Sequence, residues 1–284
     1  KISIIIPVYN AASTLAACLA AVDSSSYSSF ELLVINDGST DESAEIARSS
    51  SARVIETPGG PVGPAAARNL GAANARGEIL FFVDADVLVS SDTLADLVGA
   101  FEQRPEYDAL FGSYDDEPGD PSFLSQYKNL AHAYIHQQAQ PEGSTFWSGC
   151  GAVRREVFFR NGGFNLARYP RPSIEDIELG RRMKSSGSRI WVNKAIRVKH
   201  LKKWTFKGLL KTEIFDRGIP WTRLILSERN IPDDLNLHQG QRVSALLTIL
   251  LVFWAAINIP QPGLVLLVFW GLSFSLFSNN WIWK

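Results

Sequence analysis

Residues 78–86 read EILFFVDAD, and this stretch decides the fold of the chain. The unbroken run of aliphatic and aromatic side chains at residues 79–83 is typical of a strand that is buried on both faces of a sheet. Asp84 and Asp86 follow this run directly. Two ionised carboxylates that directly follow a buried strand cannot both be removed from water unless a cation lies beside them. The stretch therefore predicts a core strand that ends at an acidic site.

Shorter apolar runs precede this strand and alternate with helix-forming stretches. Strands are predicted at residues 2–6, 31–35 and 53–56, and helices at residues 11–22 and 65–75. Strands that alternate with helices of about ten residues are typical of βαβ units, so we expect an α/β fold with a mostly parallel sheet flanked by helices. Ligands bind such sheets beyond the carboxyl ends of the strands. The acidic triplet and the turn at residues 36–38 both lie there and should face one cleft.

The patterns beyond residue 104 are less regular. The elements predicted there are helices at residues 123–139 and 173–186 and a strand at residues 189–198. The chain of 284 residues, 46% of them hydrophobic, is long enough for one large domain with an appendage. Its two cysteines, Cys18 and Cys150, give neither a disulfide framework nor a CxxC metal spacing, which suits a reducing compartment.

Charge is distributed unevenly along the chain, although the formal net charge is only −1. Residues 1–120 contain 6 Lys and Arg against 19 Asp and Glu, whereas residues 181–229 contain 14 against 3. The later segment should therefore meet an anionic partner, such as phosphates, a nucleic acid or a membrane surface. Residues 202–225 also mix lysines with large apolar side chains. That mixture is typical of a basic amphipathic helix lying on an anionic membrane.

Two uncharged apolar runs, at residues 243–259 and 263–278, stand near the end of the chain. Each is at or just below the shortest length that spans a bilayer, about 17 residues. Tryptophans within and after these runs add the aromatic character of a membrane interface, and no polar face is left for water. We expect a C-terminal transmembrane hairpin; the alternative is a helical hairpin buried in the core.

The acidic triplet is the first candidate site. Mg²⁺ and Mn²⁺ prefer oxygen ligands and often share them with substrate phosphates, so Asp84 and Asp86 suit a metal with a diphosphate. The alternative is a solvated turn after a strand. Asp37 lies in INDGST at residues 35–40. A turn explains these residue types, whereas hydrogen bonding to a nucleotide base or ribose is the functional interpretation.

Four further residues have both a structural and a functional interpretation. Arg68 follows a Gly/Pro loop, and this loop lacks the GxxxxGK[ST] pattern of a P-loop. The Arg68 side chain is either solvated or placed beside a diphosphate or an acidic pair. Glu175 and Asp176 open a predicted helix, where acids are favoured, and either suits a general base that deprotonates an acceptor hydroxyl. His200 is either a structural histidine or the completion of a metal site.

Several segments occur together in an order that resembles the family 2 glycosyltransferases of the GT-A fold, over residues 1–200. Each segment is short and common by itself, whereas the ordered set is specific. The segments are SIIIPVYN at residues 3–10, NDGSTD at 36–41, ARN at 67–69, DAD at 84–86 and ED at 175–176.

The resemblance implies a Rossmann-like GT-A sheet and an inverting, metal-dependent transfer from a nucleotide sugar, usually UDP- or GDP-linked. By this resemblance Pro7 and Tyr9 line the base pocket, and Asp37 binds the base. Asp84 contacts the ribose, and Asp86 ligates Mg²⁺ or Mn²⁺.

For the acceptor side, Asp176 resembles the catalytic base, with Glu175 beside it, and His200 matches the position of another metal ligand. Some membrane-bound relatives carry a Q/RxxRW motif. Arg217 and Trp221 are present here with a different spacing, which argues against the processive synthases of cellulose or hyaluronan type. We expect both to belong to the nucleotide-sugar site, with Arg217 on the diphosphate or the acceptor.

The expected organisation has three parts. A catalytic domain at residues 1–200 divides into a nucleotide-sugar half, 1–115, and an acceptor half, 116–200. A basic juxtamembrane segment at 201–242 and a transmembrane hairpin at 243–284 follow. The positive charges before the hairpin favour a membrane protein whose catalytic domain faces the cytoplasm. We expect a membrane-proximal lipid or glycan acceptor, such as a polyprenyl phosphate or a glycolipid, and no nucleic acid; a soluble or polysaccharide hydroxyl is the alternative.

Two other classes of protein have to be distinguished. A sugar nucleotidyltransferase would also use carboxylates and a metal on an α/β sheet, but it should show a Gly-rich basic loop after the first strand, where PVYN stands at residues 7–10. A non-catalytic membrane adaptor would keep the fold and bind the nucleotide sugar only. The intact Asp84, Asp86 and Asp176 argue against the adaptor.

Overall fold

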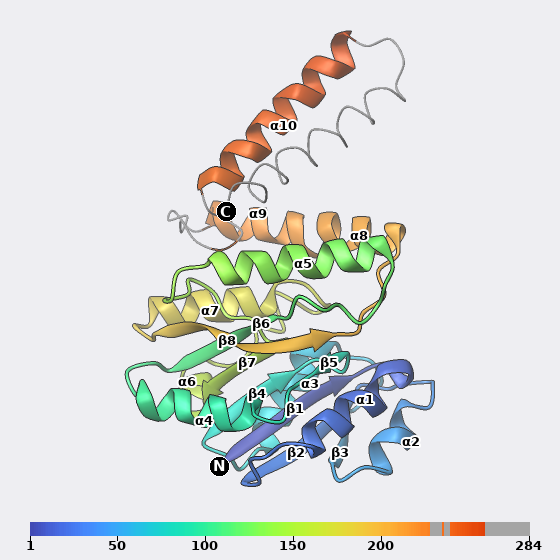
Figure 1. Ribbon diagram of the computed structural model, residues 1–284, viewed down its shortest axis with the longest axis vertical. Coiled ribbons are helices and arrows are strands. Elements are labelled where there is room, and N and C mark those ends of the chain that lie inside the picture. The colour runs from blue at the N-terminus through green and yellow to red at the C-terminus, as the bar shows by residue number, and fades with distance from the viewer. Residues whose placement is uncertain (228–234, 236–238, 259–284) are drawn as a thin grey trace. The chain divides into compact units, whose positions relative to one another are not determined.

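The computed structural model describes residues 1–227, 235 and 239–258 (Figure 1). The chain forms two compact units, Lys1–Asn230 and Ile231–Lys284. The first unit contains every candidate site residue named above. The strands are β1 (Ile2–Val8), β2 (Phe30–Asn36), β3 (Arg53–Glu56), β4 (Ile79–Val83), β5 (Val87–Leu88), β6 (Ala109–Tyr114), β7 (Cys150–Arg154) and β8 (Ile190–His200).

The strands form an eight-stranded sheet in the order β3-β2-β1-β4-β7-β6-β8-β5. The four strands from β3 to β4 pair in parallel, as predicted. Beyond them the sheet is mixed, because β7 pairs antiparallel with both β4 and β6, and β5 pairs antiparallel with β8. The predicted parallel pairing therefore holds throughout the first half of the unit, whereas the second half combines these antiparallel pairs with the parallel pair of β6 and β8.

Helices cover both faces of the sheet, as Figure 1 shows for the first unit. Strand β1 fixes the two faces, because successive side chains on a strand point to opposite sides. Ile4 and Ile6 share the main core with residues of the first helix, such as Leu15. Ile5 points the other way, toward Gly71 on the third helix, where a Cβ atom would overlap its side chain. The first and third helices therefore lie on opposite faces, and glycine at position 71 permits the close approach.

The helices of the first unit agree closely with the predicted ranges where those were given. They are α1 (Ala12–Asp23), α2 (Ser43–Arg48), α3 (Pro64–Asn74), α4 (Thr93–Gln103), α5 (Phe123–Gln138), α6 (Arg155–Arg160), α7 (Glu175–Ser185), α8 (Phe206–Lys211), η1 (Thr212–Gly218) and α9 (Ile219–Ser227). The amphipathic helix expected at residues 202–225 corresponds to α8, η1 and α9, which follow one another without a break from Phe206 to Ser227. Within this stretch η1 is a π-helix. Short π-helical turns inside helices are frequent at functional sites.

The second unit contributes α10 (Gln239–Asn258), which includes all of the first apolar run except Ile259. Within the part of the chain that the structure describes, no helix combines the length and the apolar character that a bilayer span requires. The predicted transmembrane hairpin is thus not found there, and its second run, residues 263–278, lies outside the described residues.

Candidate functional site

The carboxyl ends of β1 and β2 are joined by hydrogen bonds between the loops that follow them. The Asp37 N–H donates to the Val8 carbonyl at 2.7 Å, and the Thr40 N–H donates to the Asn10 side chain at 2.8 Å. These contacts hold Tyr9, whose side chain is 53% exposed, beside the turn after β2. Pro7 lies in the last part of β1 and is half-buried. Pro7, Tyr9 and Asp37 are therefore neighbours, as the prediction of a common base pocket requires.

Asp37 is buried and anchors the loop between β3 and α3. Its carboxylate accepts hydrogen bonds from the Thr57 hydroxyl at 2.7 Å and from the N–H groups of Val62 and Gly63 at 2.9 and 2.8 Å. Gly38 fits beside this loop because it has a positive φ of 71° and because a Cβ there would lie 3.1 Å from Gly60. In the structure Asp37 therefore holds the loop between β3 and α3 in place. Contact between Asp37 and a nucleotide base stays a prediction.

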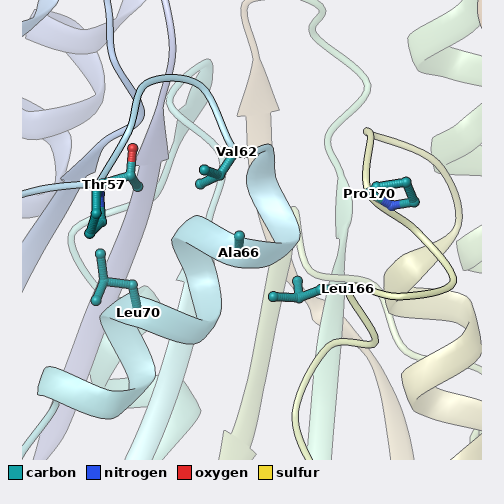
Figure 2. Close-up of a pocket in the computed structure, with 7 residues that line it drawn as sticks. Thr57, Val62, Ala66, Leu70, Leu166 and Pro170 are labelled. Carbon is teal, nitrogen blue, oxygen red and sulfur yellow. The ribbon is translucent and has the colours of Figure 1, made fainter.

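An apolar hollow of about 370 Å³ lies against the anchored loop (Figure 2). Thr57 and Val62 form one side of it, and Ala66 and Leu70 of α3 form its floor. Its lining contains no charged side chain; the lining residues are Thr57, Pro58, Val62, Ala66, Leu70, Leu166 and Pro170. The hollow is therefore suited to binding an apolar group rather than to catalysis.

Arg68 of α3 links the end of β4 to the start of α7. Its Nη2 lies 2.6 Å from Asp84 Oδ1, and its Nη1 lies 3.2 Å from Glu175 Oε1. The guanidinium is buried, and burial opposes its charge, but the carboxylates of Asp84 and Glu175 outweigh that cost and raise the pKa of Arg68. Arg68 is thus a permanent cation between two acids that are far apart in the sequence, and the prediction that places it beside an acidic pair agrees with this geometry.

Glu175 is buried and both of its carboxylate oxygens are engaged. One contacts Arg68, and the other accepts a hydrogen bond from the Ser173 N–H at 2.8 Å. Burial raises the pKa of Glu175, against the opposing charge of Arg68. Glu175 therefore supports Arg68 and the first turn of α7. Asp84 differs, because its side chain is 35% exposed and only one of its oxygens contacts Arg68, so it can still meet a ribose.

Asp176 is only partly buried and stands next to Glu175 on α7. Its Oδ2 accepts hydrogen bonds from the N–H and the hydroxyl of Ser148, at 3.0 and 3.2 Å. Its Oδ1 accepts from the Ile177 N–H at 2.8 Å. These donors fix the carboxylate and leave it accessible, which is what a general base needs. The sequence did not reveal Ser148, which is buried and 28 residues away along the chain.

Asp86 and His200 come together through the pairing of β5 with β8. The Leu201 N–H donates to the Asp86 carbonyl at 2.8 Å, and Val87 stands opposite His200. His200 Nε2 lies 3.5 Å from Asp86 Oδ2. Burial of Asp86 opposes its ionisation, but the neighbouring His200 and Lys202 prevail and lower the pKa of this carboxyl. The structure thus pairs the two residues that were predicted as metal ligands.

These two side chains match what a divalent metal shared with a substrate requires. In the described residues no group of three or more His, Cys, Asp or Glu side chains could enclose a metal ion by itself. Mg²⁺ usually binds through one or two carboxylates together with water and substrate phosphates, rather than in an all-protein cage. A carboxylate and an imidazole at the mouth of the acidic site therefore fit a metal whose other ligands come from a diphosphate and water.

Arg217 and Trp221 belong to η1 and α9. Arg217 is in η1, where its Nη1 is 3.7 Å from Glu213 Oε1, and Glu213 also pairs with Lys128 of α5 at 2.7 Å. Trp221 of α9 packs against an apolar cluster that contains Ile174, just before Glu175. Arg217 therefore belongs to a cationic group beside α5, and Trp221 supports the start of α7. Their contact with a nucleotide sugar stays a prediction.

Residues 3–160 match the sequence model of glycosyl transferase family 2, which is more than half of the chain. The chain belongs to glycosyl transferase family 2. The resemblance inferred from the motifs is confirmed at the level of the family.

GlyA of Streptococcus pneumoniae is 36% identical to this glycosyltransferase over 119 residues, which cover 40% of this chain and 17% of GlyA. An uncharacterized glycosyltransferase of Haemophilus influenzae is 41% identical over 98 residues, which cover 33% of this chain and 39% of that protein. The matched region thus spans less than half of either relative.

Solved structures show the same fold at low sequence identity. The mannosyltransferase PcManGT of Pyrobaculum calidifontis, in complex with GDP-Man and Mn²⁺, superposes with a TM-score of 0.70 at 21% identity, over 100% of this chain and 82% of that chain. TarS of S. aureus in complex with UDP-GlcNAc gives 0.57 at 20% identity, over 72% of this chain and 59% of that one. The mixed α/β sheet with flanking helices is therefore GT-A-like.

Proposed function

We propose that this family 2 glycosyltransferase transfers a sugar, with inversion, from a nucleoside-diphosphate sugar to a hydroxyl group of a lipid-linked acceptor. The observation that carries the proposal is the position of Asp176. This accessible carboxylate adjoins Glu175, which Arg68 links to Asp84 at the end of β4. One accessible general base beside the acidic residues is the minimum that an inverting transfer to a hydroxyl requires.

The donor is a UDP- or GDP-linked sugar. Both structural neighbours named above were solved with a donor of this class, GDP-Man in one and UDP-GlcNAc in the other. Tyr9 is exposed and Asp37 holds the neighbouring loop, so the ends of β1 and β2 offer a place for the base. Asp84 keeps a free, partly exposed oxygen for the ribose.

Asp86 and His200 would hold a divalent metal, Mg²⁺ or Mn²⁺, beside the diphosphate. When bound, the metal supplies Lewis-acid stabilisation of the negative charge on the diphosphate leaving group. The protein contributes one oxygen and one nitrogen, 3.5 Å apart, and the diphosphate and water contribute the rest.

Asp176 receives the proton of the acceptor hydroxyl. The acceptor oxygen forms a bond to the anomeric carbon from the side opposite the diphosphate, the bond to the diphosphate breaks, and the configuration inverts. Ser148 keeps the Asp176 carboxylate in place through two hydrogen bonds to Oδ2. Oδ1 accepts one hydrogen bond, from the Ile177 N–H, and keeps a second lone pair for the acceptor proton. Ionised phosphate acceptors have no such proton to lose, which is why the position of Asp176 favours a hydroxyl.

A lipid-linked acceptor is supported by the surface of α8, η1 and α9. Large apolar side chains are exposed along these helices, and exposed basic side chains accompany them. Such a surface suits an anionic membrane, and its basic residues favour the cytoplasmic side. The apolar residues are Phe206, Leu210, Ile214, Phe215, Ile219 and Leu226, and the basic ones are Lys203, Lys207, Lys211 and Arg223.

Neutralising two of these charges should weaken binding to anionic vesicles. Each Lys near such a surface contributes about 1 kcal/mol, so the Lys207→Gln, Lys211→Gln double variant should bind phosphatidylserine-containing vesicles roughly 30-fold more weakly. Sedimentation with vesicles measures this, with transfer to a glycolipid and to a soluble glycoside assayed in parallel.

The matched control is the Lys1→Gln, Arg76→Gln double variant, which removes the same charge before β1 and β4. It should bind vesicles as the wild type does. Unchanged vesicle binding by the Lys207, Lys211 variant, or equal transfer to the glycolipid and the soluble glycoside, would contradict a membrane-proximal acceptor and favour the soluble hydroxyl alternative.

A further inference from the structure

His200 has a second contact, on the side of the ring that faces away from Asp86. Its Nδ1 lies 3.2 Å from the Oδ1 of Asn129, a buried residue of α5. The Asn129 Nδ2 donates in turn to the Asp115 carbonyl at 3.3 Å. Asp86, His200, Asn129 and Asp115 therefore form one chain of contacts that runs from the mouth of the site into the protein.

The direction of each hydrogen bond in this chain follows from its last member, the Asp115 carbonyl. A backbone carbonyl can only accept a hydrogen bond, so the NH₂ group of Asn129 must face Asp115. The amide oxygen of Asn129 then faces His200, and an amide oxygen also can only accept. The proton between Asn129 and His200 therefore resides on the His200 Nδ1.

This assignment determines what the other ring nitrogen can do. In a neutral imidazole one nitrogen carries the proton and the other carries a lone pair. With the proton on Nδ1, the lone pair is on Nε2, which is the nitrogen 3.5 Å from Asp86. A metal binds histidine through such a lone pair. In the opposite tautomer, Nε2–H would donate to the Asp86 carboxylate, and the imidazole would be unable to ligate a metal.

Two further contacts restrain His200. Tyr114 is buried and stacks on the His200 ring, with centroids 4.3 Å apart and planes within 8° of parallel. The backbone of His200 is fixed by its pairing with Val87. The stacking restrains the plane of the ring, and Asn129 selects which nitrogen carries the proton.

We propose that Asn129 is a positioning residue that holds His200 in the Nδ1–H tautomer, so that the His200 Nε2 lone pair and the Asp86 carboxylate are presented together to the divalent ion. The inference rests on the metal of the proposed function and adds the residue that prepares its ligand. Histidines that bind metals commonly donate their other N–H to a carboxylate or carbonyl, and loss of that partner typically costs 10–100-fold in metal affinity.

The test is a titration of the protein with Mn²⁺ at saturating UDP and, separately, GDP, followed by the electron paramagnetic resonance signal of free Mn²⁺. Asn129→Leu, which removes the acceptor, should weaken Mn²⁺ binding about 10–100-fold. Asn129→Asp, which keeps an acceptor oxygen, should stay within about threefold of the wild type. Gln137→Leu is the control, because it removes a hydrogen bond from the same helix to the Lys194 carbonyl without touching His200.

A second readout separates positioning from general destabilisation. The ¹⁵N signals of the His200 ring report the tautomer directly, and they should show Nδ1–H in the wild type and a shift toward Nε2–H in Asn129→Leu. If leucine prevents folding, Asn129→Ala gives the same comparison. In a His200→Gln background, Asn129→Leu should cause no further loss of Mn²⁺ affinity.

Three results would overturn the role of Asn129: unchanged Mn²⁺ affinity in a folded Asn129→Leu, an unchanged tautomer, or an additive loss in the His200→Gln background. Because metal binding is measured without sugar transfer, failure of this inference and failure of the proposed transfer reaction are distinguishable.

Discussion

Replacing Asp176 by asparagine is expected to lower kcat for transfer to a hydroxyl acceptor by about 10²–10⁴-fold, the usual contribution of a general base. Asparagine can still accept the hydrogen bonds from Ser148 but cannot receive the acceptor proton. The KM for the donor should change little, because Asp176 meets the acceptor rather than the nucleotide. Steady-state kinetics with varied donor and acceptor measures both quantities.

Two controls make this result interpretable. Asp96→Asn makes the same exchange in the first turn of α4, on an exposed side chain, and should leave kcat unchanged. Ser148→Ala removes one of the two hydrogen bonds that Ser148 donates to Asp176 and should reduce kcat by less than about tenfold, since the backbone N–H remains. If Asp176→Asn kept the wild-type kcat with a hydroxyl acceptor, Asp176 would not be the base.

Arg68→Met is expected to destabilise the protein by about 3–5 kcal/mol, because it leaves the buried Glu175 without its cation. At the size of this domain such a loss corresponds to a fall in Tm on the order of 10 °C. Methionine replaces most of the volume of the side chain, so the effect reports the charge more than a cavity. Urea and thermal unfolding of the two proteins measure the difference.

The comparison for Arg68→Met is Arg48→Met. Arg48 pairs with Glu56 at 2.8 Å, but both side chains are about half exposed, and exposed ion pairs contribute at most about 1 kcal/mol. Adding Glu175→Gln to Arg68→Met should restore part of the lost stability, since it removes the unpaired charge. Equal destabilisation by Arg48→Met and Arg68→Met would show that the buried bridge does not hold α3, β4 and α7 together.

The first half of the fold was predictable because its strands are decided locally. Each of β1, β2 and β4 is mostly apolar and is followed by a turn or loop, and its predicted range lies within about two residues of the observed one. Strands β6 and β7 escaped prediction, because their sequences, ALFGSY and CGAVR, include small and polar residues that are buried only through pairing with distant strands. The insertion of β7 between β4 and β6 also makes the sheet mixed.

The sequence allowed most residues of the candidate site to be named, but it did not show which of their side chains contact one another. Asp86 and His200, predicted as metal ligands, lie side by side, and their binding of a metal stays a prediction. Glu175, predicted to stand beside the base, pairs with Arg68, 107 residues away. Ser148, Asn129 and Tyr114 were missed, because each acts only through a side chain that a different strand or helix brings to it. Such partners have no local pattern in a single sequence.

The products formed from a nucleoside-diphosphate sugar test the proposed reaction most directly. The measurement is ³¹P and ¹H NMR of the wild type and of Asp86→Ala, incubated with UDP- and GDP-sugars, Mn²⁺ and a glycolipid acceptor. We predict release of the nucleoside diphosphate together with an inverted glycoside, lost on chelation of the metal and in Asp86→Ala. Release of pyrophosphate, binding without turnover, or full activity of metal-free enzyme would contradict it.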